Sequence, residues 1–436
     1  MSSYQDQTSP GFETRQIHAG EIIDSETRAR ITPIYQTAGH QFDSFDDGED
    51  RFAGRSPYRA YSRNDNPTNA VAGRRLADLE GGVDGLVVAS GQAAIAVALF
   101  ALASAGDHIL ATANLYEGTR EMFGGSLKRQ GLLVEYVDPD ASDKEWASRI
   151  TPKTRAIYTE SIPNPRNDIV DLERLATIAH RAGVPLVVDS TVATPYLCRP
   201  IEWGADIIIH STSKWLAGHG SVIGGAIIDS GNFDWAANAA RFPQLTSAPR
   251  PGAISFVERF GRSAYLAYLR TVIVLEYGPT VPPTSTFLLL QGIETLSLRM
   301  ERHVLNAQRV AEAISGHPAL SATHYPGLEN DAYHQRALKY FPLGAGSIVS
   351  IDLRGGRDAA RTFIDSLRLV SPMTHIGDVR SLAIHTGSTI HGKLTEEERL
   401  EIGITPGLIR LSIGLETSTD IIADLLNALD AVQLSR

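Results

Sequence analysis

The stretch Asp206-Ile-Ile-Ile-His-Ser-Thr-Ser-Lys214 is an apolar run that ends in small hydroxyl residues and a lysine. A short apolar run of this kind is typical of a buried strand, and a lysine directly after one is uncommon because burying an ammonium group is costly. Burial lowers the pKa of a lysine, which suits an amine that forms an imine. The stretch therefore predicts a strand of a buried sheet with a reactive lysine at its end.

Runs of the same kind recur upstream of this stretch and alternate with helical patterns. Together with 206–210 itself, these runs cover residues 85–89, 108–111, 132–137, 156–159 and 186–188. Such alternation indicates parallel strands joined by crossover helices, with both faces of the sheet buried. We therefore expect a large α/β domain with a mostly parallel sheet at residues 67–285.

The regions on either side have different patterns. In the C-terminal part, helical spacing of apolar residues begins near Leu296, runs 347–353 and 408–413 resemble strands, and helices are expected near 358–367 and 419–434. This predicts a smaller α+β domain at 286–436. Residues 1–66 are polar and irregular, and we expect an N-terminal arm that contacts a neighbouring subunit. No clear pattern emerges from 231–283.

Two further strand ends carry polar residues. The run after Leu86 leads into Ser90-Gly91-Gln92 and an alanine-rich helix, whose N-terminus can hold a phosphate. Taken alone, this junction more often means that Ser90 is a simple helix cap. Asp189 ends the run that begins at Val184; it could pair with a protonated ring nitrogen or cap the next element. Together with Lys214, these residues favour a site for pyridoxal 5'-phosphate (PLP) over coincidence.

Composition excludes several classes of function. The chain has 436 residues with a formal net charge of −10 and no basic cluster, so a nucleic-acid partner is not expected. Cys198 is the sole cysteine, and His385 and His391 lack the spacing of a helical ligand pair, so we expect no metal. The first residues are polar and the apolar run 95–105 is too short for a membrane span, which predicts a cytoplasmic enzyme with a small-molecule substrate. The charges around Arg299 predict a solvated helix face.

Motifs along nearly the whole chain resemble one family. They include Tyr61-Ser-Arg-Asn-Asp-Asn-Pro-Thr68, Ser90-Gly-Gln-Ala93, Ala193-Thr-Pro-Tyr-Leu-Cys-Arg-Pro200, Leu289-Leu-Gln-Gly-Ile-Glu-Thr-Leu296 and Leu408-Ile-Arg-Leu-Ser-Ile-Gly-Leu-Glu416. The sequence resembles the Cys/Met-metabolism (transsulfuration) family of PLP-dependent enzymes, and within it the O-acetylhomoserine sulfhydrylases. The resemblance implies an aspartate-aminotransferase-like fold (fold type I) and PLP as cofactor.

The resemblance also implies roles at the reacting centre. Lys214 would bind the cofactor covalently and act as a base, and Tyr116 would stack on the ring and assist proton transfers. Asp189 would keep the ring nitrogen protonated. Asn164 would contact the ring hydroxyl, and Arg410 would bind the α-carboxylate of the substrate with its planar fork of donors.

The phosphate of the cofactor would lie among residues from more than one segment. Within the chain, the resemblance implies Ser90, Gly91, Gln92, Ser211 and Ser213 as its ligands. Tyr61 and Arg63 would reach the phosphate from a neighbouring subunit, with Tyr61 also on the substrate side. This implies a homo-oligomer with shared sites, and we expect a homotetramer built from two dimers.

The activity implied is γ-substitution on an O-activated homoserine: O-acetylhomoserine reacts with sulfide or a thiol to give a homocysteine- or methionine-type product and acetate. Three alternatives remain open at this point. A carbon or bulkier nucleophile could replace sulfide, a γ-lyase could release the carbon chain by hydrolysis, or the chain could be a non-catalytic PLP-fold binding protein.

Some positions depart from the family pattern on the nucleophile side. They are Glu117 in place of the first glycine after Tyr116, Pro282-Pro283, His375 and Ile390. A carboxylate at 117 would repel a hydrosulfide anion and could hold a cationic or protic nucleophile. Alternatively, Glu117 points to solvent and favours the start of a helix.

Overall fold

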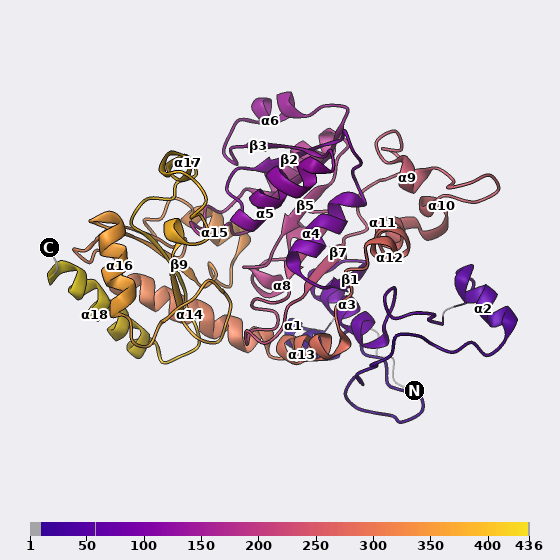
Figure 1. Ribbon diagram of the computed structural model, residues 1–436, viewed down its shortest axis with the longest axis horizontal. Coiled ribbons are helices and arrows are strands. Elements are labelled where there is room, and N and C mark those ends of the chain that lie inside the picture. The colour runs from indigo at the N-terminus through magenta and orange to yellow at the C-terminus, as the bar shows by residue number, and fades with distance from the viewer. Residues whose placement is uncertain (1–9, 57, 435–436) are drawn as a thin grey trace, which may run out of the picture.

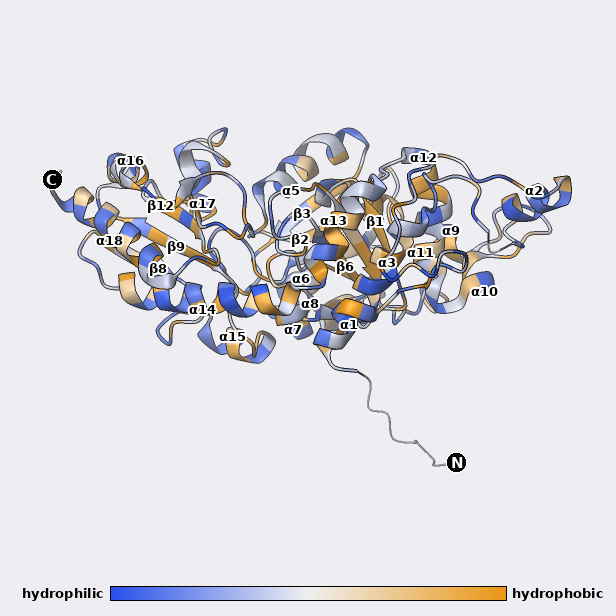
Figure 2. Ribbon diagram, turned by 90° about the horizontal axis from the view of Figure 1, so that it is seen from below, coloured by the Kyte–Doolittle hydropathy of each residue, from blue (hydrophilic) through white to orange (hydrophobic). Residues whose placement is uncertain are grey.

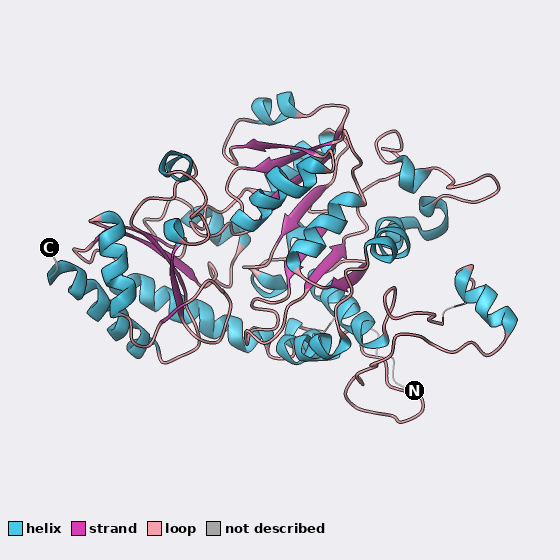
Figure 3. Ribbon diagram, in the orientation of Figure 1, coloured by secondary structure: helices cyan, strands magenta, loops and turns pink. Residues whose placement is uncertain are grey.

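The computed structural model describes residues 10–56 and 58–434 and contains two sheets (Figure 3). The larger sheet has seven strands in the order β1-β7-β6-β5-β4-β2-β3, and β7 alone runs antiparallel to its neighbours. These strands are β1 (Asp84–Val88), β2 (His108–Thr112), β3 (Leu133–Val137), β4 (Thr154–Glu160), β5 (Leu186–Asp189), β6 (Ile207–Ser211) and β7 (Gly225–Asp229). The predicted mostly parallel sheet is confirmed, whereas β7 was not predicted.

Both faces of the large sheet are buried, and successive residues of a strand point to opposite faces. On β4, for example, Ile157 belongs to the buried cluster that includes residues of α3 (Pro67–Glu80) and α7 (Leu172–Arg181). Tyr158 belongs to the other cluster, which includes residues of α4 (Gly91–Phe100) and α11 (Ala264–Tyr268). Helices α4 and α5 (Glu117–Met122) lie on the face turned toward the viewer in Figure 1. This double cover explains the nearly continuous apolar composition of the strands.

Further helices complete the large domain and connect it to the C-terminal part. They are α6 (Asp143–Arg149), α8 (Thr194–Leu197), α9 (Pro243–Thr246), α10 (Phe256–Phe260), α12 (Val274–Tyr277) and α13 (Pro283–Ile293). The expected domain boundary between residues 285 and 286 falls within α13. Helix α14 (Leu296–Ile314) follows at once and runs along the C-terminal sheet (Figure 1).

The C-terminal part is a sheet of five strands in the order β10-β11-β12-β9-β8, with helices packed beside it. The strands are β8 (Leu320–His324), β9 (Ile348–Leu353), β10 (Ser371–Pro372), β11 (Leu382–His385) and β12 (Leu408–Ser412), and the helices are α15 (His334–Tyr340), α16 (Gly356–Ser366), α17 (Glu396–Glu401) and α18 (Ser418–Leu434). Strands β9 and β12 and helices α16 and α18 match the sequence prediction closely. The smaller α+β unit is thus present.

The N-terminal segment has two short helices, α1 (Phe12–His18) and α2 (Phe45–Phe52). Helix α1 is fixed to the body of the protein, because Gln16 is buried and its side chain hydrogen-bonds Ser297 at the start of α14. Helix α2 lies at the far end of the molecule from the C-terminus (Figure 2). Phe45 and Phe52 on α2 are 86% and 81% exposed in the single chain. No helix in the described ranges is long and apolar enough to cross a membrane.

Candidate active site

The chemistry-bearing residues gather at one edge of the large sheet. Strands β1, β4, β5 and β6 run parallel, so their carboxyl ends meet at the same edge. Gly225, at the start of β7, is paired both with Ser211 on β6 and with Val88 on β1. The Ser90-Gly91 junction and the Ser211–Lys214 turn therefore flank the same short stretch of β7. In open α/β sheets, ligands bind at this position.

Close backbone packing shapes this junction. A Cβ built on Gly91 would lie 2.7 Å from the Cβ of Ser211, and one built on Gly225 would lie 2.1 Å from the carbonyl oxygen of Ser90. Only glycine permits these approaches. The N-terminus of α4 is thus brought against the Ser211 turn, where unpaired backbone N–H groups can hold a phosphate. The Oε1 atom of Gln92 is buried here without a hydrogen-bond partner among the described residues.

Two of the expected phosphate ligands are also used structurally. The Ser90 side chain caps α4 and accepts a hydrogen bond of 3.0 Å from the Ala93 N–H. The Ser213 hydroxyl accepts a 3.0 Å hydrogen bond from the Gly224 N–H and donates to the Gly224 carbonyl at 3.3 Å. The Ser211 N–H donates a 2.8 Å hydrogen bond to the Thr191 hydroxyl. The hydroxyl of Ser211 is not used in this bond.

Lys214 lies in a partly buried position against a histidine. Its Nζ is 3.1 Å from Nδ1 of His375, which approaches from the C-terminal part of the chain. Burial, followed by the nearby charge of Arg410, lowers the pKa of Lys214 to about 8. Burial, the charge of Lys214 and that of Arg410 lower the pKa of His375 to about 4, against a smaller opposing effect of Asp378. An amine with so low a pKa is partly free as a nucleophile near neutral pH.

Asp189 ends β5 beside a second carboxylate. Its Oδ1 atom accepts a 3.0 Å hydrogen bond from the Thr191 N–H and a second hydrogen bond from the Thr191 hydroxyl. Glu160 on β4 is paired in register with Asp189. Burial raises the pKa of both carboxyls, and the charge of Asp189 raises that of Glu160 further. A cation bound at this edge would relieve the repulsion between the two acids.

Tyr116, Asn164 and Arg410 complete the site. The Tyr116 N–H donates a 2.6 Å hydrogen bond to Glu160, which places this tyrosine beside the carboxylate pair. Arg410, only 2% exposed, donates to Asn164 Oδ1 at 2.9 Å and to the carbonyls of Thr374 and His375 at 2.8 and 3.2 Å. Burial lowers its pKa to about 10. Its Nε has no hydrogen-bond partner, and it forms no ion pair with a carboxylate of the described chain.

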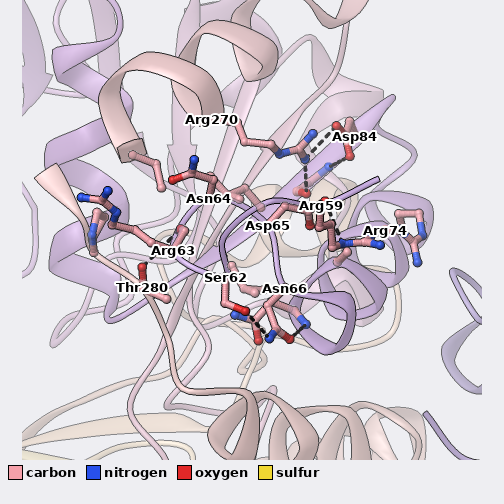
Figure 4. A pocket seen from close by; sticks show the side chains of 17 residues that line it. Arg59, Ser62, Arg63, Asn64, Asp65, Asn66, Arg74, Asp84, Arg270 and Thr280 are labelled. Carbon is pink, nitrogen blue, oxygen red and sulfur yellow. Dashed lines mark hydrogen bonds and ion pairs between the residues drawn. The ribbon is translucent and has the colours of Figure 1, made fainter. Parts of the chain in front are cut away.

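Tyr61 and Arg63 lie beside one another in the single chain. Arg63 is stacked over the Tyr61 ring at 5.6 Å and lines a cavity of about 270 Å³ together with Thr280. In Figure 4 it stands apart from the Arg270–Asp84 ion pair of 2.9 Å on the other side of that cavity. No hydrogen bond among the described residues joins Tyr61 or Arg63 to the residues expected to bind the phosphate.

The positions that depart from the family pattern fall in three places, one of which is His375 beside Lys214. Glu117 begins α5 and is 7% exposed, so the alternative in which it points to solvent is wrong. It meets His391 from the loop that also carries Ile390. Pro282 and Pro283 stand at the start of α13. A proline there costs no hydrogen bond of the helix, because the first N–H groups of a helix have no partner within it.

Sequence reasoning missed one carboxylate and misplaced one arginine. Glu160 ends a buried strand just as Asp189 does, so the same pattern could have identified it. Arg299 is not on a solvated face: it is 6% exposed and donates to the carbonyls of Trp215, Leu216 and Gly292 at 2.6, 3.2 and 2.6 Å. Its guanidinium fixes the turn that follows Lys214, because it donates hydrogen bonds to several carbonyls at once.

Comparisons with known proteins agree with this geometry. The chain is 44% identical over 422 residues to homocysteine synthase of Schizosaccharomyces pombe, covering 96% of this chain and 98% of the relative. It is 43% identical to O-acetyl-L-homoserine sulfhydrylase 1 of Thermus thermophilus, covering 96% of this chain and 99% of the relative.

A crystal structure described as an O-acetylhomoserine (thiol)-lyase of Campylobacter jejuni superposes with a TM-score of 0.92 at 36% identity, over 96% of this chain and 99% of that one. That protein carries an N'-pyridoxyl-lysine 5'-monophosphate. The family model for Cys/Met metabolism PLP-dependent enzymes matches residues 13–430. The protein is therefore a PLP-dependent enzyme of fold type I, and it belongs to the Cys/Met metabolism family.

Proposed function

We propose that the enzyme catalyses γ-substitution on O-acetylhomoserine, in which sulfide replaces acetate and homocysteine is formed. The observation that carries this proposal is the buried Arg410, a cation with no carboxylate partner in the described chain and with an unused Nε donor. A buried unpaired cation is costly, and the α-carboxylate of an amino acid would satisfy it. The names of the relatives support O-acetylhomoserine as that amino acid.

The residues at the sheet edge fit PLP. We propose that Lys214 holds the cofactor, Asp189 faces its ring nitrogen, Asn164 contacts its ring hydroxyl, and Ser90, Gly91, Gln92, Ser211 and Ser213 surround its phosphate. Bound there, PLP supplies an electrophilic carbonyl carbon and an electron-withdrawing ring. The two glycines bring the N-terminus of α4 against the Ser211 turn, so that its free backbone N–H groups can donate hydrogen bonds to the phosphate.

The protein side chains then manage the protons. Arg410 binds the α-carboxylate of the substrate and so presents its Cα to Lys214. Lys214, with a pKa of about 8 as a free amine, removes the Cα proton and returns it at the end. Tyr116 assists in removing a proton from Cβ and in returning it there after substitution. Acetate leaves from Cγ, and the nucleophile bonds there.

The proposed function is tested by supplying O-acetylhomoserine with sulfide and measuring acetate and homocysteine. Equal amounts of both products are expected. Release of ammonia and 2-oxobutyrate in place of homocysteine would instead show a γ-lyase. Failure of O-acetyl-, O-succinyl- and O-phosphohomoserine to release any leaving group would contradict the proposal.

We further propose a cytoplasmic homotetramer, made of two dimers in which each active site is completed by Tyr61 and Arg63 of the neighbouring subunit. Among the described residues, no hydrogen bond joins the Arg63 side chain to the expected phosphate ligands of its own chain, which supports a shared site. Mixing inactive Arg63→Ala with inactive Lys214→Ala is expected to restore activity, since one of the two sites in a hybrid dimer is undamaged. Random exchange would give up to about a quarter of the wild-type rate. No gain in rate after verified subunit exchange would show that each chain builds its own site.

A further inference from the structure

A buried carboxylate without a hydrogen-bond partner lies directly beside Tyr116. The Oε2 atom of Glu117 is 3.8 Å from Nε2 of His391, which is 2% exposed, and 3.8 Å from Nε of Arg120. Both distances exceed hydrogen-bond length. Within the described part of the chain, this oxygen and Nδ1 of His391 both lack a hydrogen-bond partner. Leaving such groups unsatisfied is costly, so this contact has free capacity for a hydrogen-bonding ligand.

The contact belongs to the active site. A Cβ built on Gly118, the residue after Glu117, would lie 2.5 Å from the Tyr116 ring and 2.7 Å from Nε2 of Gln92, so the start of α5 is packed against the cofactor site. Burial raises the pKa of Tyr116 and lowers that of His391 to about 4, and the charge of Arg410 acts on both. The Glu117–His391 contact is thus within electrostatic reach of the residue that binds the substrate carboxylate.

The charges around the contact leave Glu117 able to gain and lose a proton. Burial raises its pKa; Arg120 and Lys393 act against this effect, while Glu121 and Glu398 reinforce it. Lys393 is itself bound to Glu121 at 2.7 Å. Around His391, the cations that oppose protonation are Arg410, Arg120 and Arg399. His391 is therefore neutral near neutral pH.

We propose that Glu117 accepts the proton of the incoming nucleophile, with His391 positioning its carboxylate, so that the site takes the nucleophile in its protonated form, as H₂S or a small thiol. This rests on the proposed function. The S–H bond breaks and its proton passes to Glu117, while sulfur bonds to Cγ, from which acetate has left with the bonding electron pair. Glu117 then releases the proton to solvent, so that O-acetylhomoserine and H₂S give homocysteine, acetate and a proton. The anion HS⁻ would instead be repelled by the carboxylate.

The test compares wild type, Glu117→Gln and the control Glu329→Gln, with sulfide or methanethiol as nucleophile and O-acetylhomoserine saturating. In wild type, kcat/KM for total sulfide is expected to fall as pH rises through the first pKa of H₂S, whereas methanethiol, protonated throughout, should show no such fall. Glu117→Gln should lower kcat/KM for methanethiol about 100-fold, because a general base is lost. With sulfide as nucleophile, the decrease in kcat/KM that Glu117→Gln causes should become smaller as the pH rises and HS⁻ replaces H₂S. Glu329→Gln, at an exposed position away from these charges, should change either value no more than about twofold.

Two results would overturn the proposal. One is a wild-type kcat/KM for sulfide that rises with the fraction of HS⁻, a measurement that needs no variant. The other is a folded, cofactor-loaded Glu117→Gln that uses methanethiol as well as wild type does. Acetate release from O-acetylhomoserine is followed in parallel. If acetate is released normally, either result refutes the role of Glu117 alone; if no acetate is released, the proposed function fails and this role fails with it.

Discussion

Replacing Lys214 with alanine is expected to lower kcat by about 10⁴-fold or more, since one substitution removes both the covalent anchor of the cofactor and the base at Cα. The visible absorbance of the lysine-bound cofactor should disappear as well. Both effects follow from the position of Lys214 after β6, where burial lowers its pKa to about 8 and where Nζ lies within reach of His375. Turnover of O-acetylhomoserine and the absorption spectrum measure the two effects separately.

Two further lysine variants serve as controls for this prediction. Lys153 is exposed and is distant from Lys214 in the sequence, so Lys153→Ala should retain the spectrum and the rate of wild type. Lys214→Arg keeps the charge but cannot form the imine, so it should be as inactive as the alanine variant. An arginine variant with substantial activity would show that charge alone, and not covalent attachment, is what the position requires.

Asp189→Asn is expected to lower kcat by about 100- to 1,000-fold, a loss typical when a preorganised electrostatic group at a reacting centre is removed. The carboxylate of Asp189 is fixed by two hydrogen bonds from Thr191 and faces the sheet edge. An amide in its place cannot stabilise a protonated ring nitrogen, so the ring withdraws electrons less effectively. The affinity for PLP should also fall, which equilibrium dialysis would measure without any turnover.

The neighbouring carboxylate provides the matched comparison. Glu160→Gln removes one of two coupled acids but keeps the hydrogen bond from the Tyr116 N–H. It should leave PLP affinity much closer to wild type than Asp189→Asn does. Burial is the largest cause of the raised pKa of Asp189, so that pKa should stay raised in this variant. If Glu160→Gln has the larger effect on PLP affinity, Glu160 and not Asp189 faces the ring nitrogen.

The sequence predicts those parts of the fold that local pattern decides. The parallel strands of the large sheet were predictable because each is a short apolar run that ends in polar residues, as at Asp189 and Ser211. Strand β7 was not, because Gly225–Asp229 follows a short glycine-containing return from β6 in place of a crossover helix. The direction of a strand joined in this way depends on tertiary packing.

The candidate site was predictable where strand ends carry it and unpredictable where packing between distant segments decides. The contact of Lys214 with His375 joins residues far apart in sequence, as does that of Glu117 with His391. Arg299 has the local sequence of a solvated face, yet it is buried because three backbone carbonyls accept its hydrogen bonds. Departures from the family pattern can be found in the sequence, but the sequence could not show which way their side chains point.

The most direct test of a PLP enzyme with Lys214 at its centre is to reduce the holoenzyme with borohydride, digest it, and locate the pyridoxyl group by mass spectrometry. Reduction fixes the cofactor to whichever amine holds it, so the measurement does not depend on substrate or turnover. The modification is expected on Lys214 alone, in stoichiometric amount. A pyridoxyl group on another lysine, or none in a protein that still turns over O-acetylhomoserine, would contradict the account.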